Sequence, residues 1–335
     1  MPEPVVASVI IVNYRGRDRL GRCLDAISAA AGETAYEVLV VDNASNDGSW
    51  HEAGGRPGVR LIRNDENVGF GRACNQAVRE ARGRQLVFLN FDCEPQDGWL
   101  DALVRAADDD PSAGAVQAVI LHPDGTVNTA GNELHYLGFS WAPHGETAPS
   151  GPPFEVTVGS GAGLLVPRDR FEQVGGFWES MFLYCEDTDL SWRLRLAGYR
   201  ILTAPAARVV HEYEFGRNTD KFFHLERNRL LMVVANYERA TLLALVPGLL
   251  ATELALVAVS LRGGWARRKL EADVSAVRAW RDVRRQRAAV ALLRRVPDRE
   301  VAARFARRLG PEFGEGVARA SAGLLAAYAR VARLS

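Results

Sequence analysis

Residues 5–43 read VVASVIIVNYRGRDRLGRCLDAISAAAGETAYEVLVVDN, and this stretch decides the fold class. Val5–Val12 is an uninterrupted apolar run, which is typical of a strand buried on both faces of a parallel sheet. Arg17–Ala30 then carries apolar residues at helical spacing, and Glu37–Val41 is a second apolar run. This alternation of strand, helix and strand predicts the beginning of a doubly wound α/β sheet.

The same alternation continues along the chain. Further strands are predicted at Val59–Arg63, Gln85–Asn90, Val116–Leu121, Val156–Val166 and Tyr199–Thr203, and further helices at Gly71–Arg82, Asp187–Ala197 and Asp220–Tyr237. Residues 122–155 are rich in Gly, Pro and His and predict loops with short β-pieces. We therefore expect a mostly parallel, Rossmann-like sheet flanked by helices.

Composition and charge change near residue 241. Residues 1–240 carry 23 basic and 33 acidic side chains, a net charge of −10, whereas residues 241–335 carry 18 and 8, a net charge of +10. Thr241–Leu261 is mostly Leu, Ala and Val, and an arginine-rich helical stretch follows it to about Arg308. We predict an α/β domain over residues 1–240 and a helical extension, first apolar and then basic, over residues 241–335.

The apolar segment leaves three arrangements open. About 20 apolar residues are enough to span a bilayer, but Pro247, Gly248 and Glu253 interrupt this one. A span, a helix lying in a membrane surface and a buried core helix are all compatible with it. The basic residues that follow favour an anionic membrane surface as a partner of the extension.

The cysteines and the N-terminus predict the compartment. The four cysteines are widely spaced and form no CxxC pair, which favours reduced thiols in a cytosolic protein. The chain starts with Met-Pro-Glu-Pro, so the apolar run that follows lacks the basic residues of a signal peptide. We expect a cytoplasmic protein held peripherally on the inner face of the cell membrane.

Polar clusters follow three of the predicted strands, at Asn13–Tyr14, Asp42–Asn43 and Asn90–Asp92. Asn and Asp also favour turns and helix caps, but the carboxyl ends of parallel strands meet at one edge, where ligands bind. Asp42 suits a hydrogen bond to a base or ribose, and Asp92 suits Mg²⁺ or Mn²⁺ bridging a diphosphate. The sequence contains no GxGxxG, P-loop, GxSxG or HExxH motif, so the site belongs to none of those classes.

A second cluster of acids stands at the predicted start of the helix Asp187–Ala197. Glu186, Asp187 and Asp189 suit a helix N-terminus, but a carboxylate there can also accept a proton from an attacking hydroxyl. Arg193 follows Asp189 by one turn and is expected to orient the carboxylate. The glycine-rich segment Gly159–Gly163 precedes the cluster and permits close approach of a ligand.

Seven stretches of the first 240 residues carry a family resemblance. They are SVIIVNYRGRDRLGRCLDAI, VLVVDNASNDGS, NDENVGFGRACNQAV, LVFLNFDCEP, GGFWESMFLYCEDTDLSWRLRLAGY, VVHEYEF and KFFHLERNRLL. In this order the chain resembles the inverting family 2 glycosyltransferases of the GT-A fold, and within them it is similar to bacterial rhamnosyltransferase-like enzymes of surface-polysaccharide assembly. The apolar segment with its basic tail resembles the C-terminal part of such enzymes.

The resemblance implies roles for individual residues. Nucleotide-sugar binding is expected from Asn13, Tyr14, Asp42, Asn43, Asn67, Gly69 and Asn90. Asp92 and His211 would bind the metal ion, Asp187 would be the general base with Glu186 beside it, and Gly161, Trp178 and Arg193 would contact the acceptor. Two of these positions depart from the family pattern, because Asn90 replaces the first acid of a DxD motif and Trp178 stands where an acid is often found.

The implied activity is inverting transfer of a sugar from a nucleotide donor to a glycan or lipid-linked acceptor, without a nucleic-acid partner. The favoured donor is dTDP-rhamnose, and a UDP-sugar is the alternative. A nucleotidyltransferase would carry a glycine-rich basic loop after its first strand, and Asn13–Arg17 matches such a loop poorly. A non-catalytic nucleotide-sugar-binding protein would have lost the acids, yet Asp92, Glu186 and Asp187 are all present.

Overall fold

The structure is a computed structural model that describes residues 4–30, 32–212 and 220–310, together with residues 323, 325 and 328–330. The strands are β1 Ala7–Asn13, β2 Tyr36–Asp42, β3 Val59–Arg63, β4 Gln85–Asn90, β5 Cys93–Pro95, β6 Ala113–Leu121, β7 Val127–Thr129, β8 Glu133–Leu134, β9 Ser140–Trp141, β10 Phe154–Glu155, β11 Gly163–Pro167 and β12 Arg200–His211. The helices are α1 Arg19–Ala30, α2 Phe70–Glu80, α3 Trp99–Asp109, α4 Arg168–Gln173, α5 Glu186–Leu196, α6 Lys221–Asn236, α7 Arg239–Arg262, α8 Ala266–Arg278, α9 Trp280–Leu293 and α10 Asp298–Ala302.

One central sheet organises the first 211 residues. Its strand order is β10-β12-β6-β11-β4-β1-β2-β3, with β5 paired to β12 and β7 to β6. Strands β4, β1, β2 and β3 run parallel, and β11 is antiparallel to both of its neighbours. The register pairs Asn13 with Asp42, so the polar residues at the ends of β1 and β2 lie side by side. This confirms the α/β class with a mostly parallel sheet.

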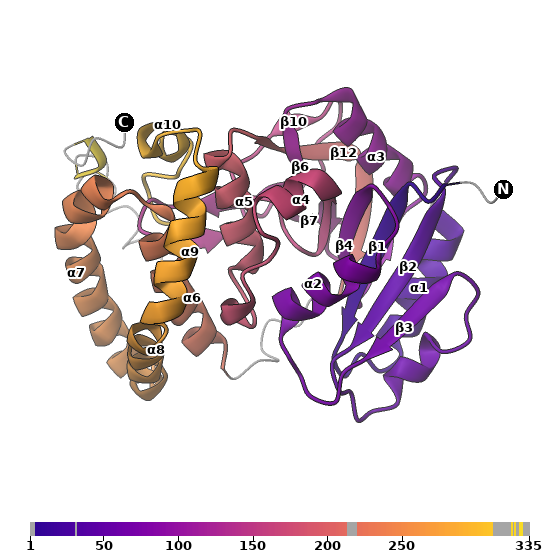
Figure 1. Ribbon diagram of the computed structural model, residues 1–335, viewed down its shortest axis with the longest axis horizontal. Coiled ribbons are helices and arrows are strands. Elements are labelled where there is room, and N and C mark those ends of the chain that lie inside the picture. The colour runs from indigo at the N-terminus through magenta and orange to yellow at the C-terminus, as the bar shows by residue number, and fades with distance from the viewer. Residues whose placement is uncertain are drawn as a thin grey trace.

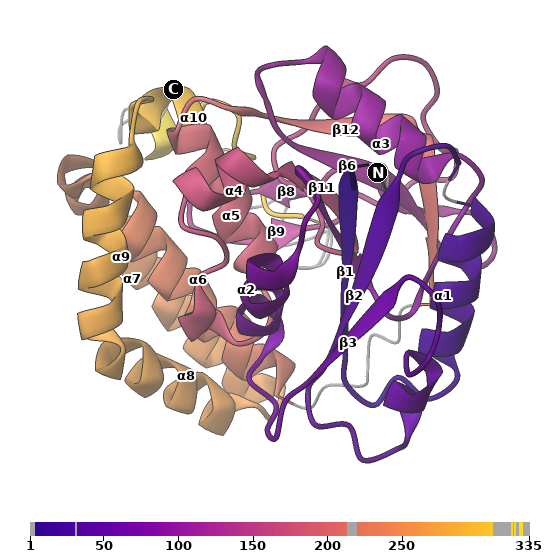
Figure 2. The same cartoon turned by 45° about the vertical axis from the view of Figure 1, so that its right-hand side comes forward.

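Helices cover both faces of this sheet, as Figure 1 and Figure 2 show. Helices α1 and α3 pack on one face, and α2, α4 and α5 pack on the other. Strands β1, β2 and β4 are buried on both faces, which explains why they read as continuous apolar runs rather than as alternating ones. The sheet is therefore a fixed platform whose edge at the strand ends carries the polar clusters.

The C-terminal helices form a second core beside the sheet (Figure 1). Apolar residues of α6, α7, α9 and α10 pack there with Trp192 of α5 and with residues 134–139. Helix α7 contains the apolar segment of the extension and is the one described helix long and apolar enough to cross a membrane. Only 6% of its most apolar window is buried inside the protein, which is unlike the core helix of a soluble protein.

Two predicted strands have different limits in the structure. The strand predicted at Val156–Val166 is confined to its last part, because two backbone N–H groups just before that part bond to side chains rather than to a neighbouring strand. Ser160 donates to Gln117 Oε1 at 2.7 Å, and Gly161 donates to Asp187 Oδ2 at 3.0 Å. The strand predicted at Tyr199–Thr203 is longer and reaches His211, since its second half pairs with β5.

Candidate active site

The ends of β1 and β2 hold one another through buried polar side chains. Asn13 Nδ2 donates to Asp42 Oδ1 at 2.7 Å and to Ser49 Oγ at 2.8 Å, and Asn13 and Asp42 are fully buried. Ser45 N–H donates to the second oxygen of Asp42 at 3.2 Å. Tyr14 is the exposed member of the cluster. The structure thus brings Asn13, Tyr14 and Asp42 together as predicted, with Tyr14 facing outward.

A second network joins the end of β2 to the start of α2. Asn43 Nδ2 donates to the carbonyl of Gly69 at 3.2 Å, and Asn64 Nδ2 donates to Asn43 Oδ1 at 2.9 Å. Asn67 Oδ1 accepts the N–H of Gly69 at 2.9 Å, which shapes the turn before the helix. The predicted nucleotide-sugar residues Asn43, Asn67 and Gly69 therefore form one connected edge with Asp42.

Asp92 and His211 meet in space although 119 positions separate them in sequence. His211 Nε2 lies 3.1 Å from Asp92 Oδ1 and 3.5 Å from Asn90 Nδ2. The pairing of β5 with β12 sets His211 opposite Cys93 and so brings the imidazole beside the end of β4. Asp92, Cys93 and His211 offer ligand atoms that all lie within 4.8 Å of one another.

The donors of this group fit a hard divalent ion. A carboxylate and an imidazole suit Mn²⁺, and Mg²⁺ is often held by one or two carboxylates together with substrate phosphates. Cys93 does not fit as a ligand, because Mg²⁺ and Mn²⁺ prefer oxygen donors to a thiol and its side chain is fully buried. That thiol donates to the carbonyl of Ala162 at 3.3 Å. Asp92 and His211 are therefore the residues suited to the metal.

The adjacent acids at the start of α5 differ in protonation. Glu186 is buried, its Oε2 has no hydrogen-bond partner among the described residues, and burial followed by the charge of Asp187 raises its pKa to about 8. Burial also raises the pKa of Asp187, but N–H groups of Gly161 and Thr188 donate to its carboxylate at 3.0 and 2.7 Å and oppose that rise. Asp187 is also the more exposed of the two. At neutral pH, Asp187 is the carboxylate that can accept a proton.

A strained loop holds this pair in place. We call residues 182–185 the base loop. Phe182, Tyr184 and Cys185 have φ values of 63°, 66° and 66°, which non-glycine residues adopt only when their surroundings enforce it. The carbonyl of Phe182 accepts the N–H of Phe70 at 2.7 Å, which joins the loop to the first residue of α2. The start of α2 and the base loop therefore touch directly.

Asn228 of α6 fastens the base loop and was missed in the sequence. Its fully buried Nδ2 lies 2.8, 2.9 and 2.8 Å from the carbonyl oxygens of Met181, Leu183 and Tyr184. The residue lies in the stretch KFFHLERNRLL, which carries the family resemblance, so a signal was present without a role attached to it.

Comparison with known proteins decides the family. Residues 8–175 match the sequence profile described as Glycosyl transferase family 2, which is half of the chain. The chain belongs to glycosyl transferase family 2. Its relatives include the N-acetylglucosaminyl-diphospho-decaprenol L-rhamnosyltransferase of Mycobacterium tuberculosis, which is 35% identical over 247 residues, a match that covers 66% of this chain and 80% of that protein.

Solved structures agree on the fold of this family 2 glycosyltransferase. GalNAc-T7 with UDP, GalNAc and Mn²⁺ superposes with a TM-score of 0.58 at 17% identity, covering 71% of this chain and 49% of the other. S. aureus TarS 1-349 superposes with a TM-score of 0.53 at 14% identity, covering 98% and 88%. The second likeness takes in the C-terminal helices as well as the sheet. Both identities are low, so these structures bear on the GT-A fold alone.

Two residues expected to contact the acceptor of this glycosyltransferase are buried in its core. Arg193 is 1% exposed and binds Asp189 at 2.7 Å, and Asn236 donates to the same carboxylate at 2.9 Å. Arg193 thus pairs with the carboxylate one turn before it, and in this buried position it offers little surface to an acceptor. Trp178 is 8% exposed and packs in the second core, so its side chain offers little surface to a ligand. Gly161, the third residue expected to contact the acceptor, lies beside Asp187 and donates its N–H to that carboxylate at 3.0 Å.

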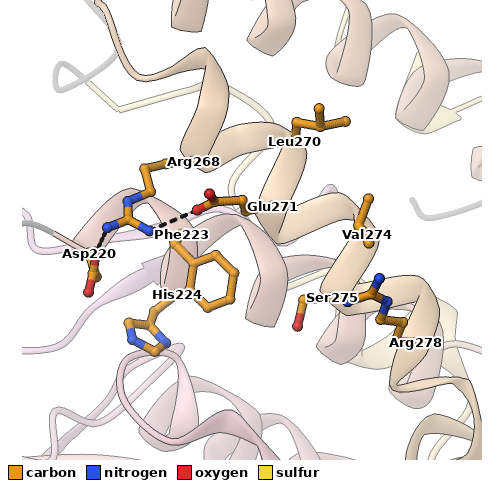
Figure 3. A pocket seen from close by; sticks show the side chains of 9 residues that line it. All are labelled: Asp220, Phe223, His224, Arg268, Leu270, Glu271, Val274, Ser275 and Arg278. Carbon is orange, nitrogen blue, oxygen red and sulfur yellow. Dashed lines mark hydrogen bonds and ion pairs between the residues drawn. The ribbon is translucent and has the colours of Figure 1, made fainter.

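A hollow of about 560 Å³ lies between α6 and α8, apart from the predicted site residues (Figure 3). Phe223 and His224 line it from α6, and Leu270 and Val274 line it from α8. Its charges largely cancel, because Arg268 is paired with Asp220 and with Glu271. The ring of His224 stacks on Phe182 of the base loop, with centroids 5.4 Å apart. The hollow thus adjoins the base loop from the side of the C-terminal helices.

Proposed function

We propose that this glycosyltransferase transfers rhamnose from dTDP-rhamnose to a lipid-linked glycan with inversion at the anomeric carbon. The observation that carries the proposal is the pairing of Asp92 with His211 at the sheet edge that also holds Asp42, together with a separate carboxylate, Asp187, at the start of α5, just after the base loop that is fastened to α2. The sugar and the acceptor class follow the M. tuberculosis relative, whose name specifies a rhamnosyl group and a diphospho-decaprenol. A UDP-sugar is the alternative donor.

The proposed reaction is a single displacement. The acceptor hydroxyl oxygen forms a bond to the anomeric carbon while the bond from that carbon to the diphosphate oxygen breaks. Asp187 accepts the hydroxyl proton, and the N–H groups of Gly161 and Thr188 keep its carboxylate oriented. The edge formed by Asn13, Asp42 and Asn43 would hold the nucleoside.

Asp92 and His211 would hold a divalent ion, which when bound neutralises charge on the departing nucleotide diphosphate. Mn²⁺ is present in the GalNAc-T7 complex, which supports a divalent ion in this fold. Mg²⁺ is the alternative ion, because it is commonly held by one or two carboxylates together with substrate phosphates, and Asp92 supplies one carboxylate. Neutral Glu186 stays beside Asp187 without competing for the proton.

The first experiment measures release of nucleotide from dTDP-, UDP- and GDP-sugars with Mn²⁺ or Mg²⁺, comparing the wild-type protein with Asp92→Ala. We expect one metal-dependent release, lost in the variant. If no nucleotide sugar binds with or without metal, the proposal is wrong. Binding without release, in the presence of candidate acceptors, would instead favour a non-catalytic nucleotide-sugar-binding protein.

Asp187→Asn tests the base directly. The amide keeps the shape of the side chain but cannot accept the proton, and general bases contribute about 10²–10⁴-fold to turnover. We expect a loss of that order in kcat with donor affinity retained, measured by steady-state transfer and by donor titration. A loss of only about threefold would contradict the assignment.

We also propose that the enzyme works on the inner face of the cell membrane. A lipid-linked acceptor resides in a bilayer, and the basic extension suits an anionic surface. Helix α7, apolar and largely exposed, supports the same placement.

A further inference from the structure

The outward side of α7 and α8 is a continuous apolar surface. On α7, Leu243, Leu250, Leu254 and Leu261 are 73%, 61%, 73% and 67% exposed, and Val246 and Val257 lie between them at helical spacing. On α8, exposed Leu270, Val274 and Val277 follow the same spacing. We call these nine residues the apolar stripe. Apolar surface on this scale marks an interaction site rather than ordinary solvent contact.

The opposite side of α7 is fixed to the protein by buried charges. Glu253, near the middle of the helix, binds Arg229 of α6 and Lys269 of α8, and both cations are almost fully buried. Arg229 also binds Glu226 at 3.1 Å, and Lys269 binds Asp273 at 2.6 Å. These partners leave Glu253 satisfied only while α7 lies against α6 and α8.

The first half of α7 is held in a second way. Pro247 lies inside the helix, and the hydroxyl of Tyr328 bridges two backbone groups of the helix next to it. Tyr328 Oη donates to the carbonyl of Ala244 at 2.6 Å and accepts the N–H of Gly248 at 3.0 Å. Tyr328 thus contacts α7 at the break, where the helix depends on a polar group from another segment.

A membrane-spanning arrangement of α7 conflicts with these contacts. A spanning helix is surrounded by hydrocarbon at the middle of the bilayer. The ion pairs of Glu253 with Arg229 and Lys269 would then have to enter the hydrocarbon or break. A helix with one side packed on the protein and one side exposed and apolar lies in the plane of the interface. Of the three arrangements that the sequence left open, the structure therefore favours a helix lying in a membrane surface.

The charges around the stripe select the surface that covers it. Residues 262–295 contain 11 basic and 3 acidic side chains. Arg267 pairs with Glu271 and Arg285 with Asp282, but the two arginine side chains are 91% and 83% exposed and can therefore be reached by lipid headgroups. Basic residues flanking an exposed apolar surface match the anionic headgroups and acyl chains of a phospholipid bilayer.

We propose that the apolar stripe of α7 and α8 lies in the plane of an anionic phospholipid bilayer, with neither helix crossing it. The proposal rests on the proposed function in one respect: membrane binding would serve to bring a lipid-linked acceptor to the site. Leu270 and Val274 of the stripe also line the hollow beside His224 (Figure 3), and His224 stacks on the base loop. The membrane-facing surface is therefore close to the base loop, which directly precedes Asp187 at the start of α5.

The test is co-sedimentation of the full chain with vesicles of phosphatidylglycerol and phosphatidylcholine, compared with phosphatidylcholine alone. The variant Leu250→Glu/Leu254→Glu places two carboxylates on the stripe, and Leu292→Glu is its matched control, because Leu292 is 90% exposed on α9. We expect binding only to anionic vesicles, a loss of about tenfold or more in the double variant, and no change in the control. Alkaline carbonate should release the bound protein.

Three outcomes would overturn the proposal. The first is unchanged binding of the double variant, and the second is protein that resists carbonate, as a spanning helix would. The third is a wild-type protein that does not bind vesicles but forms a concentration-dependent oligomer, which the double substitution dissociates. In that case a second copy of the chain would cover the stripe. Vesicle binding needs no donor, so it can fail or succeed independently of transferase activity.

Discussion

Glu186 and Asp187 are neighbours in sequence, yet their carboxyl groups meet different surroundings. Asp187 accepts two backbone N–H groups, whereas one oxygen of Glu186 has no partner in the described part of the chain. This difference supports the proposal that Asp187 is the base, and it predicts that Glu186 has a measurable effect on stability. The two effects can be separated, because one appears in turnover and the other in unfolding.

Glu186→Gln should stabilise the protein increasingly as pH rises. The folded pKa of Glu186 is about 8, above its unfolded value, so the folded state retains a proton that the unfolded chain releases. Wild-type stability therefore falls between roughly pH 4.5 and pH 8 by up to about 1.4 kcal/mol per pH unit, while Gln does not titrate. Urea unfolding at about pH 5.5 and about pH 7.5 should show the variant's advantage growing by about 3 kcal/mol. An advantage independent of pH would contradict the buried, protonated state of Glu186.

Asn228 is a positioning residue, and Asn228→Asp should show this. The carboxylate has the same shape but donates no hydrogen bond and would face three carbonyl oxygens. We expect kcat to fall about tenfold or more with donor affinity nearly unchanged, and stability to fall by about 1–3 kcal/mol. Asn75→Asp is the control, because Asn75 donates to the carbonyl of Phe177 at 2.9 Å, outside the base loop. Equal effects of the two variants on kcat would remove the special role of Asn228.

At the scale of elements, the joint between α2 and the base loop depends on one glycine. Gly69 has φ 85° and ψ 167°, and a Cβ there would lie 2.5 Å from the carbonyl oxygen of Phe182 and 2.8 Å from its Cα. Both contacts are with backbone, so either the start of α2 or the base loop would have to move. The glycine therefore links donor binding to the position of Asp187.

Gly69→Ala should lower both donor affinity and kcat, by about tenfold or more in kcat/KM. Gly98→Ala is a matched control, since Gly98 precedes α3 with φ 73° and nothing lies within 4 Å of its added Cβ. The control should lose about 1–2 kcal/mol of stability from backbone strain and keep its activity. Steady-state kinetics and thermal unfolding of both variants measure this. Matching losses of activity would show that strain alone, rather than the contact with Phe182, is responsible.

The elements also show how far sequence reasoning reaches. Strands β1, β2 and β4 were predictable because burial on both faces leaves an uninterrupted apolar signal. Pairing of Asp92 with His211 depends on the register of β5 and β12, which no local pattern encodes, so only the family resemblance pointed to it. Positive φ values at Phe182 and Tyr184 have no sequence signature, because they result from tertiary hydrogen bonds. Burial of Arg193 was not predictable, because an arginine paired in the core and one that faces a ligand look alike in sequence.

At the scale of the whole molecule, charge and apolar surface are divided between two parts. The first 240 residues have a net charge of −10 and contain the predicted site. The remaining 95 residues have a net charge of +10 and contain the apolar stripe. An acidic body is repelled by an anionic bilayer while the extension is attracted to it. This division should orient the molecule with α7 and α8 toward the membrane.

Orientation of this kind predicts that the membrane matters for transfer but not for the chemistry at the donor. The variant Leu250→Glu/Leu254→Glu should hydrolyse the donor in solution within about twofold of wild type, because both side chains are exposed on α7 and neither is among the predicted site residues. Transfer to a lipid-linked acceptor in anionic vesicles should nevertheless fall about tenfold or more. Raising salt from about 0.1 M to about 1 M shortens the Debye length from about 10 Å to about 3 Å and should lower wild-type transfer in vesicles in the same selective way. Presenting the acceptor in neutral detergent micelles should restore the variant, since no bilayer then has to be engaged. If transfer in vesicles is as fast for the variant as for the wild type, the stripe does not bring the enzyme to its acceptor. If hydrolysis falls in parallel, the substitutions have disturbed the site itself.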